Sequence, residues 1–359
     1  MLDWQHTYRL SRFALLRIGD SGFVIESSLT NQVLPIVGPS VMRVLAVLGR
    51  PIRLEALIML VEESQRAPLR VFLEACYEAR LLTQVKDDGT TEEETSSLAH
   101  WEFHDLLFHA SGRLGRNRQA IGATYRLKNR VLPEAALHPV RDGRIIALPR
   151  PCQQGKKNNF LSGAVDHRRS RCGLRSLNLD CLSELLYRSC RTTKIIDDSD
   201  DTATQTIYPS GEGVHPLNVY VAISLCNGCV PGLYAYQDVD HNLRQIRGLD
   251  FTVQRLLSDA RDSMGGLSGN PSVLLIVSAR FRRTALKYES IAYRLILLEV
   301  GALFQTIHLA ATDIGIAACA LGSGDSDHFA RAIGSDYYAE TSVGEVALGM
   351  DPPPTNPIS

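Results

Sequence analysis

The sequence has no excess of charge of one sign and no long apolar run. Its 359 residues include 38 Lys and Arg against 39 Asp and Glu, a net charge of −1. Proteins that bind nucleic acid or an anionic membrane electrostatically usually carry a basic excess, so the charge favours neither partner. The most apolar stretch is interrupted by Arg294, Glu299, Gln305 and His308, short of the roughly 20 apolar residues that cross a bilayer. We therefore expect no nucleic-acid partner and no membrane span.

Features of secretion are also missing. The N-terminus, MLDWQHTYRLSRFALLRIGD, has no clean hydrophobic region followed by a small-residue cleavage site. The eight cysteines are scattered along the chain, without the density of a secreted disulfide scaffold. We expect a cytoplasmic protein.

One cysteine pair, Cys226 and Cys229 in CNGC, has the spacing of a zinc or redox motif. However, Asn-Gly stands here between two alternating apolar runs, VYVAISL and VPGLYAYQ. That arrangement is the strongest short signal for a β-hairpin, and no second CxxC follows at zinc-knuckle spacing. The sequence favours a hairpin over a metal or redox site.

Two other groups of potential metal ligands have structural interpretations. Of His100, His104 and His109, two lie i,i+4 on a predicted helix, but the nearest acid is not in an HExxH frame, which favours partly buried structural histidines. The acidic run at residues 197–201, DDSDD, lacks the glycine and distal glutamate of a calcium loop and is interpreted as a solvated loop. We predict no metal site.

The length and the 45% hydrophobic composition favour two domains. Residues 1–95 combine a strand pair with short amphipathic helices, a pattern typical of a winged-helix-like docking domain, although a basic DNA-binding face is not evident. The segment KDDGTTEEETSS has no apolar period and is predicted to be a linker or exposed loop. We assign 96–160 to a linker and connecting helix, and 161–359 to the second domain.

Three stretches of the second domain could carry chemistry. HRRSRCGLRS, residues 167–176, presents guanidinium groups around a hydroxyl and suits a phosphate monoester as well as a solvated basic turn. YPSGEGVHPLNVY, residues 208–220, places glycines where the backbone could approach a flat ligand, or where any turn leads into a strand. The third stretch contains Lys287 and Tyr288, before an apolar segment of helical period that begins near Ile291 and is predicted to be buried on nearly all sides. A lysine snorkelling from a helix start beside a core tyrosine is the alternative for this pair.

Taken in order, RRS, YPSGEGVHPLNVY, GLYAYQ, LKYESIAYRLILLEVG and GEVALG resemble the SagB-type dehydrogenases. These are FMN-dependent enzymes of the nitroreductase superfamily that oxidise azoline rings in ribosomally made peptides. The resemblance spans residues 161–349 and implies an α+β nitroreductase-like fold behind the winged-helix-like domain. It further implies FMN as cofactor, a precursor peptide as substrate, a cyclodehydratase partner and a homodimer with FMN at its interface.

The resemblance also implies roles for individual residues. Arg168, Arg169 and Ser170 would hold the FMN phosphate. Cys172 stands where the family often has a further basic residue. Either Arg171 or Arg175 takes the place of that residue, or the phosphate is held more weakly. The loop against the flavin ring would comprise Pro209, Ser210, Gly211 and Gly213, with Glu212 pointing away. Gly322 and Gly324 are further candidate flavin contacts.

Lys287 and Tyr288 are the catalytic residues that the resemblance implies. Oxidising an azoline removes a proton from the α-carbon and a hydride from the adjacent ring carbon, so the protein must supply a base. We expect desolvation and the positive end of a helix to favour neutral lysine, with one residue as base and the other as its orienting partner. Two alternatives remain open: an NAD(P)H-dependent nitroreductase-like reduction of a nitro or quinone compound, and a flavin-less binding subunit.

Overall fold

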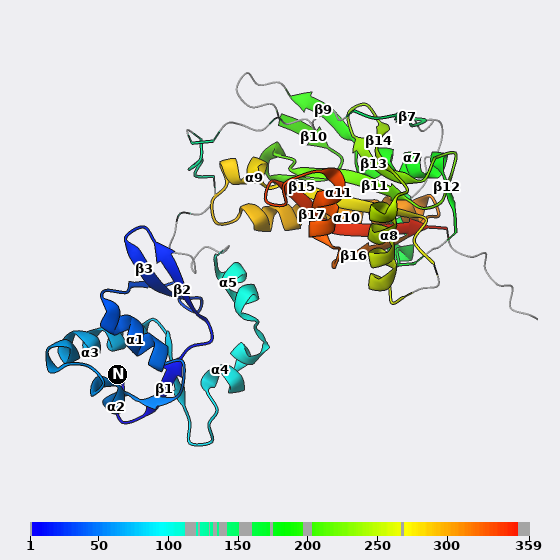
Figure 1. Cartoon of the computed structure of the whole chain (residues 1–359). Helices are drawn as coiled ribbons and strands as arrows, with labels where there is room; N and C mark the ends of the chain where they lie inside the picture. The colour runs from blue at the N-terminus through cyan, green and yellow to red at the C-terminus, as the bar shows by residue number, and fades with distance from the viewer. Residues whose placement is uncertain are drawn as a thin grey trace, which may run out of the picture. The chain divides into compact units, whose positions relative to one another are not determined.

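The computed structural model describes residues 2–111, 120, 123–128, 130–131, 135, 142–150, 160–172, 175–196, 203–266 and 269–350. The chain divides into two compact units, Met1–Gly122 and Ala123–Ser359, both drawn in Figure 1. The boundary between the units falls at residue 122, whereas the sequence placed domain boundaries near 95 and 160. The acidic run at 197–201 lies outside the described residues.

The first unit contains two small antiparallel sheets. In one sheet, β1 (Thr7–Leu10) pairs with β5 (Ile52–Arg53) and with β6 (Leu82–Val85). The other sheet has the order β2-β3-β4, with bounds Ala14–Gly19, Gly22–Ser27 and Val33–Pro35. The first helices are α1 (Pro39–Val47), α2 (Leu54–Ile58) and α3 (Glu63–Glu78). The strand pair β2-β3 and the short helices α1, α2 and α3 before strand β6 agree with the pattern predicted for residues 1–95, whereas the short strand β5 was not predicted.

Helix α3 packs into the core of this unit through one face. Leu69, Leu73 and Cys76 are buried at the three- and four-residue spacing of a helical stripe. They join a cluster that includes Tyr8 of β1 and Leu57 of α2. Because this cluster is confined to residues of the first unit, the unit has a hydrophobic core of its own.

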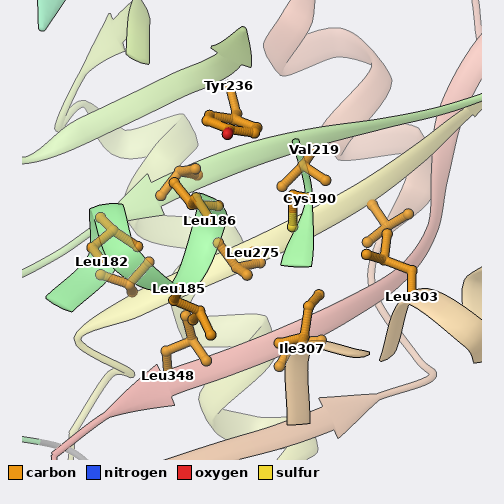
Figure 2. Packing of buried hydrophobic residues seen from close by; sticks show 14 of the residues in the cluster. Leu182, Leu185, Leu186, Cys190, Val219, Tyr236, Leu275, Leu303, Ile307 and Leu348 are labelled. Atoms are coloured by element: carbon orange, nitrogen blue, oxygen red, sulfur yellow. The ribbon is translucent and has the colours of Figure 1, made fainter. Parts of the chain in front are cut away.

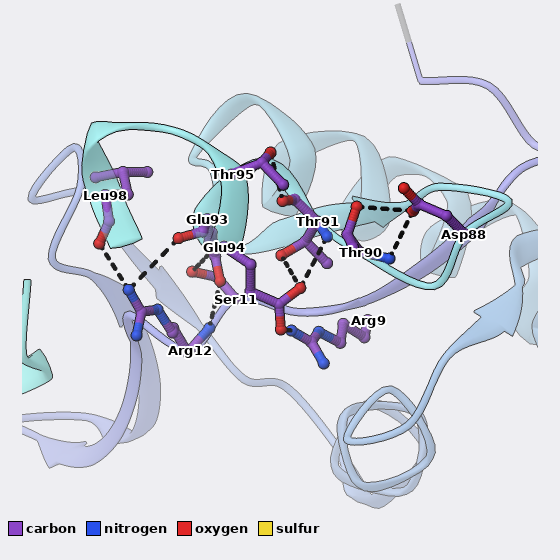
Figure 3. A network of polar contacts seen from close by, with 10 residues as sticks. All are labelled: Arg9, Ser11, Arg12, Asp88, Thr90, Thr91, Glu93, Glu94, Thr95 and Leu98. Atoms are coloured by element: carbon purple, nitrogen blue, oxygen red, sulfur yellow. Dashed lines mark hydrogen bonds and ion pairs between the residues drawn. The ribbon is translucent and has the colours of Figure 1, made fainter. Parts of the chain in front are cut away.

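The segment KDDGTTEEETSS, predicted to be a linker or exposed loop, begins as an exposed turn at residues 86–89 and continues as a short helix. Helix α4 (Glu92–Thr95) follows a turn, and the Glu93 carboxylate is buried, accepting hydrogen bonds from Ser11 Oγ at 2.5 Å and from the backbone N–H of Arg12 at 3.1 Å. Arg12 in turn donates to the Leu98 carbonyl at 2.6 Å (Figure 3). For residues 92–95 the prediction was wrong, because apolar periodicity does not detect the polar contacts that hold these residues in place. A 3-10 helix, η1 (Ser97–His100), and α5 (Phe103–Ser111) complete the unit.

The second unit is built on a seven-stranded sheet of order β16-β17-β15-β11-β13-β14-β7, antiparallel throughout. From the β16 edge, the strands are Ala317–Leu321, Glu340–Gly349, Val273–Arg280, Leu217–Ile223, Gly232–Gln237, Asn242–Gly248 and Ile145–Ala147. Smaller pairs are formed by β9 (Thr192–Ile196) with β10 (Ala203–Thr206) and by β8 (Leu177–Asn178) with β12 (Cys226–Asn227). With the flanking helices, this architecture confirms the predicted α+β class.

Helices cover both faces of the large sheet, because side chains alternate along each central strand. In β11, Val219 and Val221 face the cluster formed with α7 (Leu179–Ser189) and α10 (Ala292–Asp313). Figure 2 shows this cluster, with Leu185 and Leu186 opposite Leu303 and Ile307. Tyr220 faces the other way, into a cluster with α8 (Phe251–Ser263) and α11 (Ser326–Ile333). The remaining helices are α6 (Phe160–His167) and α9 (Phe281–Lys287), together with the 3-10 turn η2 (Gly211–Gly213).

Helix α10 has the predicted apolar period but is buried on one side only. Ile296, Val300 and Leu303 pack on the sheet, whereas Leu298 is 61% exposed. The prediction of burial on nearly all sides is therefore wrong for the single chain. By length and composition alone, α10 is also the one helix among the described residues that could cross a membrane.

The CNGC motif forms a turn, as predicted. Cys226 and Cys229 pair across it, Gly228 has a φ of 89°, and the flanking strands β11 and β13 are antiparallel neighbours. Within the described part of the chain, no cluster of three or more His, Cys, Asp and Glu side chains could hold a metal ion.

Candidate functional site

Lys287 and Tyr288 lie between two helices. Lys287 is the last residue of α9, and Tyr288 follows in an extended conformation, with φ −106° and ψ 140°. Helix α10 begins only at Ala292. Lys287 thus stands at the negative end of a helix dipole, not at the positive end that the sequence suggested.

Glu212 is the partner of Lys287. The lysine Nζ lies 2.5 Å from Glu212 Oε2 and 6.0 Å from the centre of the Tyr125 ring. Burial lowers the pKa of Lys287, but the hydrogen bond to Glu212 and the neighbouring Tyr288 and Tyr125 outweigh burial, so that the pKa is raised. The same contact lowers the pKa of Glu212. In this state Lys287 is an ammonium group, contrary to the neutral form expected from desolvation.

Tyr288 completes this group. Its side chain is buried, and burial raises the pKa of its phenol in spite of the adjacent ammonium. The phenol oxygen lies 3.6 Å from where a Cβ on Gly211 would stand. The Lys287–Tyr288 pair therefore packs directly against the loop that the sequence singled out.

The loop 209–213 has an unusual backbone. Glu212 adopts φ 48° and Gly213 φ 74°, both in the left-handed region. Glycine takes this conformation without cost, whereas glutamate rarely does, and such strain is typical of functional sites. Glu212, the strained residue, is also the one whose carboxylate contacts Lys287.

The Glu299 side chain of α10 holds loop 209–213 by two hydrogen bonds. Its Oε1 accepts hydrogen bonds from Ser210 Oγ at 2.8 Å and from the Gly211 N–H at 3.1 Å. The side chain is buried, and burial raises its pKa. Its Oε2 has no hydrogen-bond partner among the described residues. Glu299 was not predicted as a site residue. Its neighbours on the apolar helix gave no sign that its carboxylate has a functional role.

The predicted phosphate turn follows α6. Arg168 is half-buried, and Arg169 and Ser170 are exposed. Arg169 donates to the carbonyls of Asp166 and Arg168, at 3.0 and 2.8 Å. The Arg168 guanidinium forms no hydrogen bond or ion pair with any residue that the structure describes. Burial, and then the Arg168 charge, lower the pKa of His308 on α10.

The third predicted element, Gly322 to Gly324, follows β16 and lies near α8. Ser323 Oγ is 3.0 Å from Ser263 Oγ, and a Cβ on Gly324 would overlap the Glu345 carboxylate. Among the described residues, no hydrogen bond or ion pair joins this loop to Lys287 or to loop 209–213. The structure thus brings together Lys287, Tyr288 and loop 209–213, and places the other two elements elsewhere in the unit.

Glu345 gives a pH-dependent prediction. Burial, and then Asp259 and Asp325, raise its pKa from 4.5 to about 7. Because the folded state keeps this proton to higher pH than the unfolded chain, the free energy of unfolding should fall as pH rises from 4.5 to 7. Glu345→Gln should remove about 3 kcal/mol of that fall, measured by urea unfolding at pH 5 and pH 8. Asp327→Asn, at an exposed site, is the control, and parallel pH curves for the wild type and Glu345→Gln would contradict the assignment.

Family models match both units. Residues 8–118 match the family described as cyanobactin oxidase ThcOx, and residues 194–350 match the nitroreductase family. A protein from Methanocaldococcus jannaschii named as a nitroreductase is 29% identical over 147 residues, which are 41% of this chain and 69% of the relative.

Solved structures with similar folds include two of interest. One, described as a nitroreductase from Ralstonia eutropha, has 21% identity and a TM-score of 0.45, over 62% of this chain and 96% of its own. The other is the Escherichia coli microcin synthetase McbBCD with truncated pro-MccB17, at 20% identity and a TM-score of 0.42, over 68% of this chain and 91% of its own. At these values neither structure assigns an activity to this chain. The two family matches agree with the predicted resemblance to SagB-type enzymes: a segment similar to the cyanobactin oxidase family, residues 8–118, precedes one similar to the nitroreductase family, residues 194–350.

Proposed function

We propose that this protein is an FMN-dependent dehydrogenase that oxidises thiazoline or oxazoline rings to azoles in a ribosomally made peptide. The observation that carries the proposal is the contact of Lys287 and Tyr288 with loop 209–213, the loop expected to lie against the flavin. The succession of a cyanobactin-oxidase-type and a nitroreductase-family segment supports it. Reduction of a nitro compound or quinone by NAD(P)H is the second candidate, but it needs no carbon-acid base, so it leaves the pair without a role.

The residues present fit FMN. Arg168, Arg169 and Ser170 offer guanidinium and hydroxyl donors suited to a phosphate, and the Arg168 guanidinium is not engaged by a described residue. The buried Nδ1 of His308, on the helix beside Arg168, also has no hydrogen-bond partner among the described residues. When bound, FMN would accept the hydride from the ring.

The α-proton must go to a group of the protein. Lys287 can accept it only as the neutral amine, and the ion pair with Glu212 holds the ammonium form. The pair must therefore open, or Lys287 must lose its proton, before it acts as base. Tyr288, kept as a phenol by burial, is proposed to orient the substrate beside the lysine.

Glu212→Gln tests this coupling. Removing the carboxylate should lower the pKa of Lys287, because the hydrogen bond to Glu212 is the first of the contributions that raise it. If neutral Lys287 is the base, the rise of the oxidation rate with pH should then occur at lower pH. Glu289→Gln, on the same connection between helices, is the control. A pH–rate profile that Glu212→Gln leaves unmoved would show that Glu212 does not control the base.

We propose a homodimer as the active form. Loop 209–213 is attached at Glu299 and the phosphate turn lies near His308, nine residues further along α10. Nine residues are about two and a half helical turns, so the two attachments lie on opposite sides of α10. This placement supports a site in which the turn of one chain and the loop of its partner hold one FMN. The exposed Leu298 and Tyr293 of α10 supply apolar surface for such an interface.

The purified protein provides the test of this function. We expect it to be yellow, to release FMN on denaturation, to sediment as a dimer, and to convert an azoline peptide to a product two mass units lighter with oxygen as acceptor. A colourless protein that binds peptide would favour a flavin-less subunit. A yellow protein that reduces nitro compounds with NAD(P)H but leaves azolines unchanged would favour the second candidate.

The first unit is proposed to dock the precursor peptide or the cyclodehydratase, inside the cytoplasm. Helix α3 carries Glu63, Glu74 and Glu78 against two arginines, which does not suit DNA. A hollow of about 210 Å³ lies between α1, α2 and the start of α3, lined by apolar side chains such as Val47 and Leu60 and by polar ones such as Arg43 and Glu62. Leu60 is 63% exposed beside it, and this mixed surface suits a peptide segment that carries both apolar and polar side chains.

Deleting residues 1–122 should leave FMN bound, because each unit has its own hydrophobic core. Oxidation of a full-length precursor should be impaired, and oxidation of a short azoline peptide should be retained, as measured by mass spectrometry. Leu60→Asp offers a milder test of the same surface. A tight, salt-sensitive DNA complex of the full chain would contradict the docking role.

A further inference from the structure

Two cysteines meet at the edge of the large sheet. β16 is the edge strand, and the Arg171 N–H donates to the Ala318 carbonyl at 2.9 Å, which draws the segment after α6 onto that edge. Cys172 and Cys319 are the next residues of the two segments, and the Cys172 thiol lies close enough to Cys319 to contribute to the raised pKa of that thiol. Both are free thiols. The Arg171–Ala318 hydrogen bond and this thiol pair thus bring the two segments together.

The two thiols differ in accessibility. Cys172 is exposed, whereas Cys319 is half-buried. Burial, and then the neighbouring Cys172, raise the pKa of Cys319 to about 11. The other cysteines in the described part of the chain are buried or partly buried, and burial keeps thiols unreactive. An oxidant in solution should therefore reach Cys172 first.

The position of the pair links it to the proposed cofactor site. Cys172 follows Ser170 by two residues, and Cys319 lies in the strand that leads to Gly322. A covalent bond here would fix the segment that bears Arg168 and Ser170 against the sheet. No other covalent link is available to that segment among the described residues, because Cys172 is its one cysteine.

We propose that Cys172 and Cys319 form a reversible disulfide that fastens the Arg168–Cys172 segment to strand β16. Hydrogen peroxide, the product when oxygen takes two electrons in the proposed reaction, is the oxidant. Peroxide converts the Cys172 thiol to a sulfenic acid and releases one water; the Cys319 thiol then attacks this sulfur, forms the S–S bond and releases a second water. Two thiols lose two hydrogens in total, and one peroxide becomes two waters. A dithiol reductant restores both thiols.

The expected consequence rests on the proposed function. With the disulfide closed, the residues proposed to hold the phosphate cannot move away from β16, so FMN should leave more slowly. With the disulfide open, this segment is held to the edge strand by noncovalent contacts such as the Arg171–Ala318 hydrogen bond. Oxidation by the enzyme's own by-product would then retain the cofactor during turnover.

Peptide mass spectrometry of the purified protein tests the bond itself. After treatment with an equimolar amount of hydrogen peroxide and alkylation, we expect a Cys172–Cys319 cross-linked peptide that disappears with dithiothreitol. Cys172→Ser and Cys319→Ser should each abolish it, and Cys229→Ser, the matched control, should retain it. Another partner for Cys172, a link between two chains, or over-oxidised and unlinked Cys172 would overturn the proposal.

The rate of FMN release, followed by flavin fluorescence after dilution, tests the consequence. We expect release several-fold slower from the oxidised wild type than from the reduced wild type, and no difference in Cys172→Ser. Equal rates with the disulfide formed would overturn the retention role. A protein that lacks flavin but forms the cross-link would refute the proposed function, and with it the retention role, while the disulfide itself stands.

Discussion

Lys287→Ala and Tyr288→Phe are each expected to slow azoline oxidation by about 10²–10⁴-fold, the usual contribution of a positioned acid or base. Both variants should keep FMN and the dimer, since neither side chain belongs to the phosphate turn at 168–170. Lys287→Ala also removes the ion pair with Glu212, so the strained loop could relax. For this reason Lys287→Met, which keeps the side-chain length without the charge, should be measured beside it.

The two variants also separate the two roles. If one variant is slow and the other nearly normal, the residue replaced in the slow variant is the base, and the other residue only orients that base. Lys194→Ala and Tyr338→Phe remove the same groups at exposed positions far along the chain and should behave like the wild type. Unchanged rates in both Lys287 and Tyr288 variants would make the pair structural, a lysine over a core tyrosine.

Arg168→Ala is expected to weaken FMN binding by about 1.5–3 kcal/mol, the loss of a charge-assisted hydrogen bond. At 1.4 kcal/mol per factor of ten, this loss raises the dissociation constant about 10- to 150-fold. The fold should not suffer, because the guanidinium forms no hydrogen bond or ion pair with a described residue. Fluorescence titration of the apoprotein with FMN measures the effect.

A second variant controls for the general loss of charge. Arg261→Ala removes a guanidinium whose ion-pair partner is the neighbouring Asp262, at 2.8 Å, and should leave FMN affinity unchanged. Full flavin occupancy and normal affinity in Arg168→Ala would remove Arg168 from the phosphate site. Weaker binding that Arg168→Lys restores would show that charge, not the planar fork, is what the site requires.

Hydrophobic pattern was enough to predict much of the fold. The runs around CNGC gave the hairpin of β11 and β13, and the helical period after Ile291 gave α10. The same period could not show that one side of α10 stays open in the single chain, because periodicity reports apolar faces and not what covers them. The exposed Leu298 became visible only in the structure.

The electrostatics of the site could not be predicted from local sequence. Glu212 lies 75 positions before Lys287, and Glu299 lies 88 positions after Gly211. Without these long-range contacts, desolvation and the expected positive end of a helix suggested a neutral lysine, whereas the Glu212 contact raises the pKa of Lys287. Glu93 was missed for the same reason, since its partner Ser11 lies in a distant part of the first unit. Composition described the segment around Glu93 as a linker.

The most direct measurement of the proposed chemistry is a single turnover without oxygen. Oxidised enzyme is mixed with an azoline peptide, the flavin absorbance is followed, and air is then admitted. We expect the peptide to bleach the flavin, the product to be two mass units lighter, air to restore the colour, and Lys287→Ala and Tyr288→Phe to slow only the bleaching. If the peptide leaves the flavin oxidised while NAD(P)H bleaches it rapidly, the protein is a reductase of the second kind and the azoline proposal is wrong.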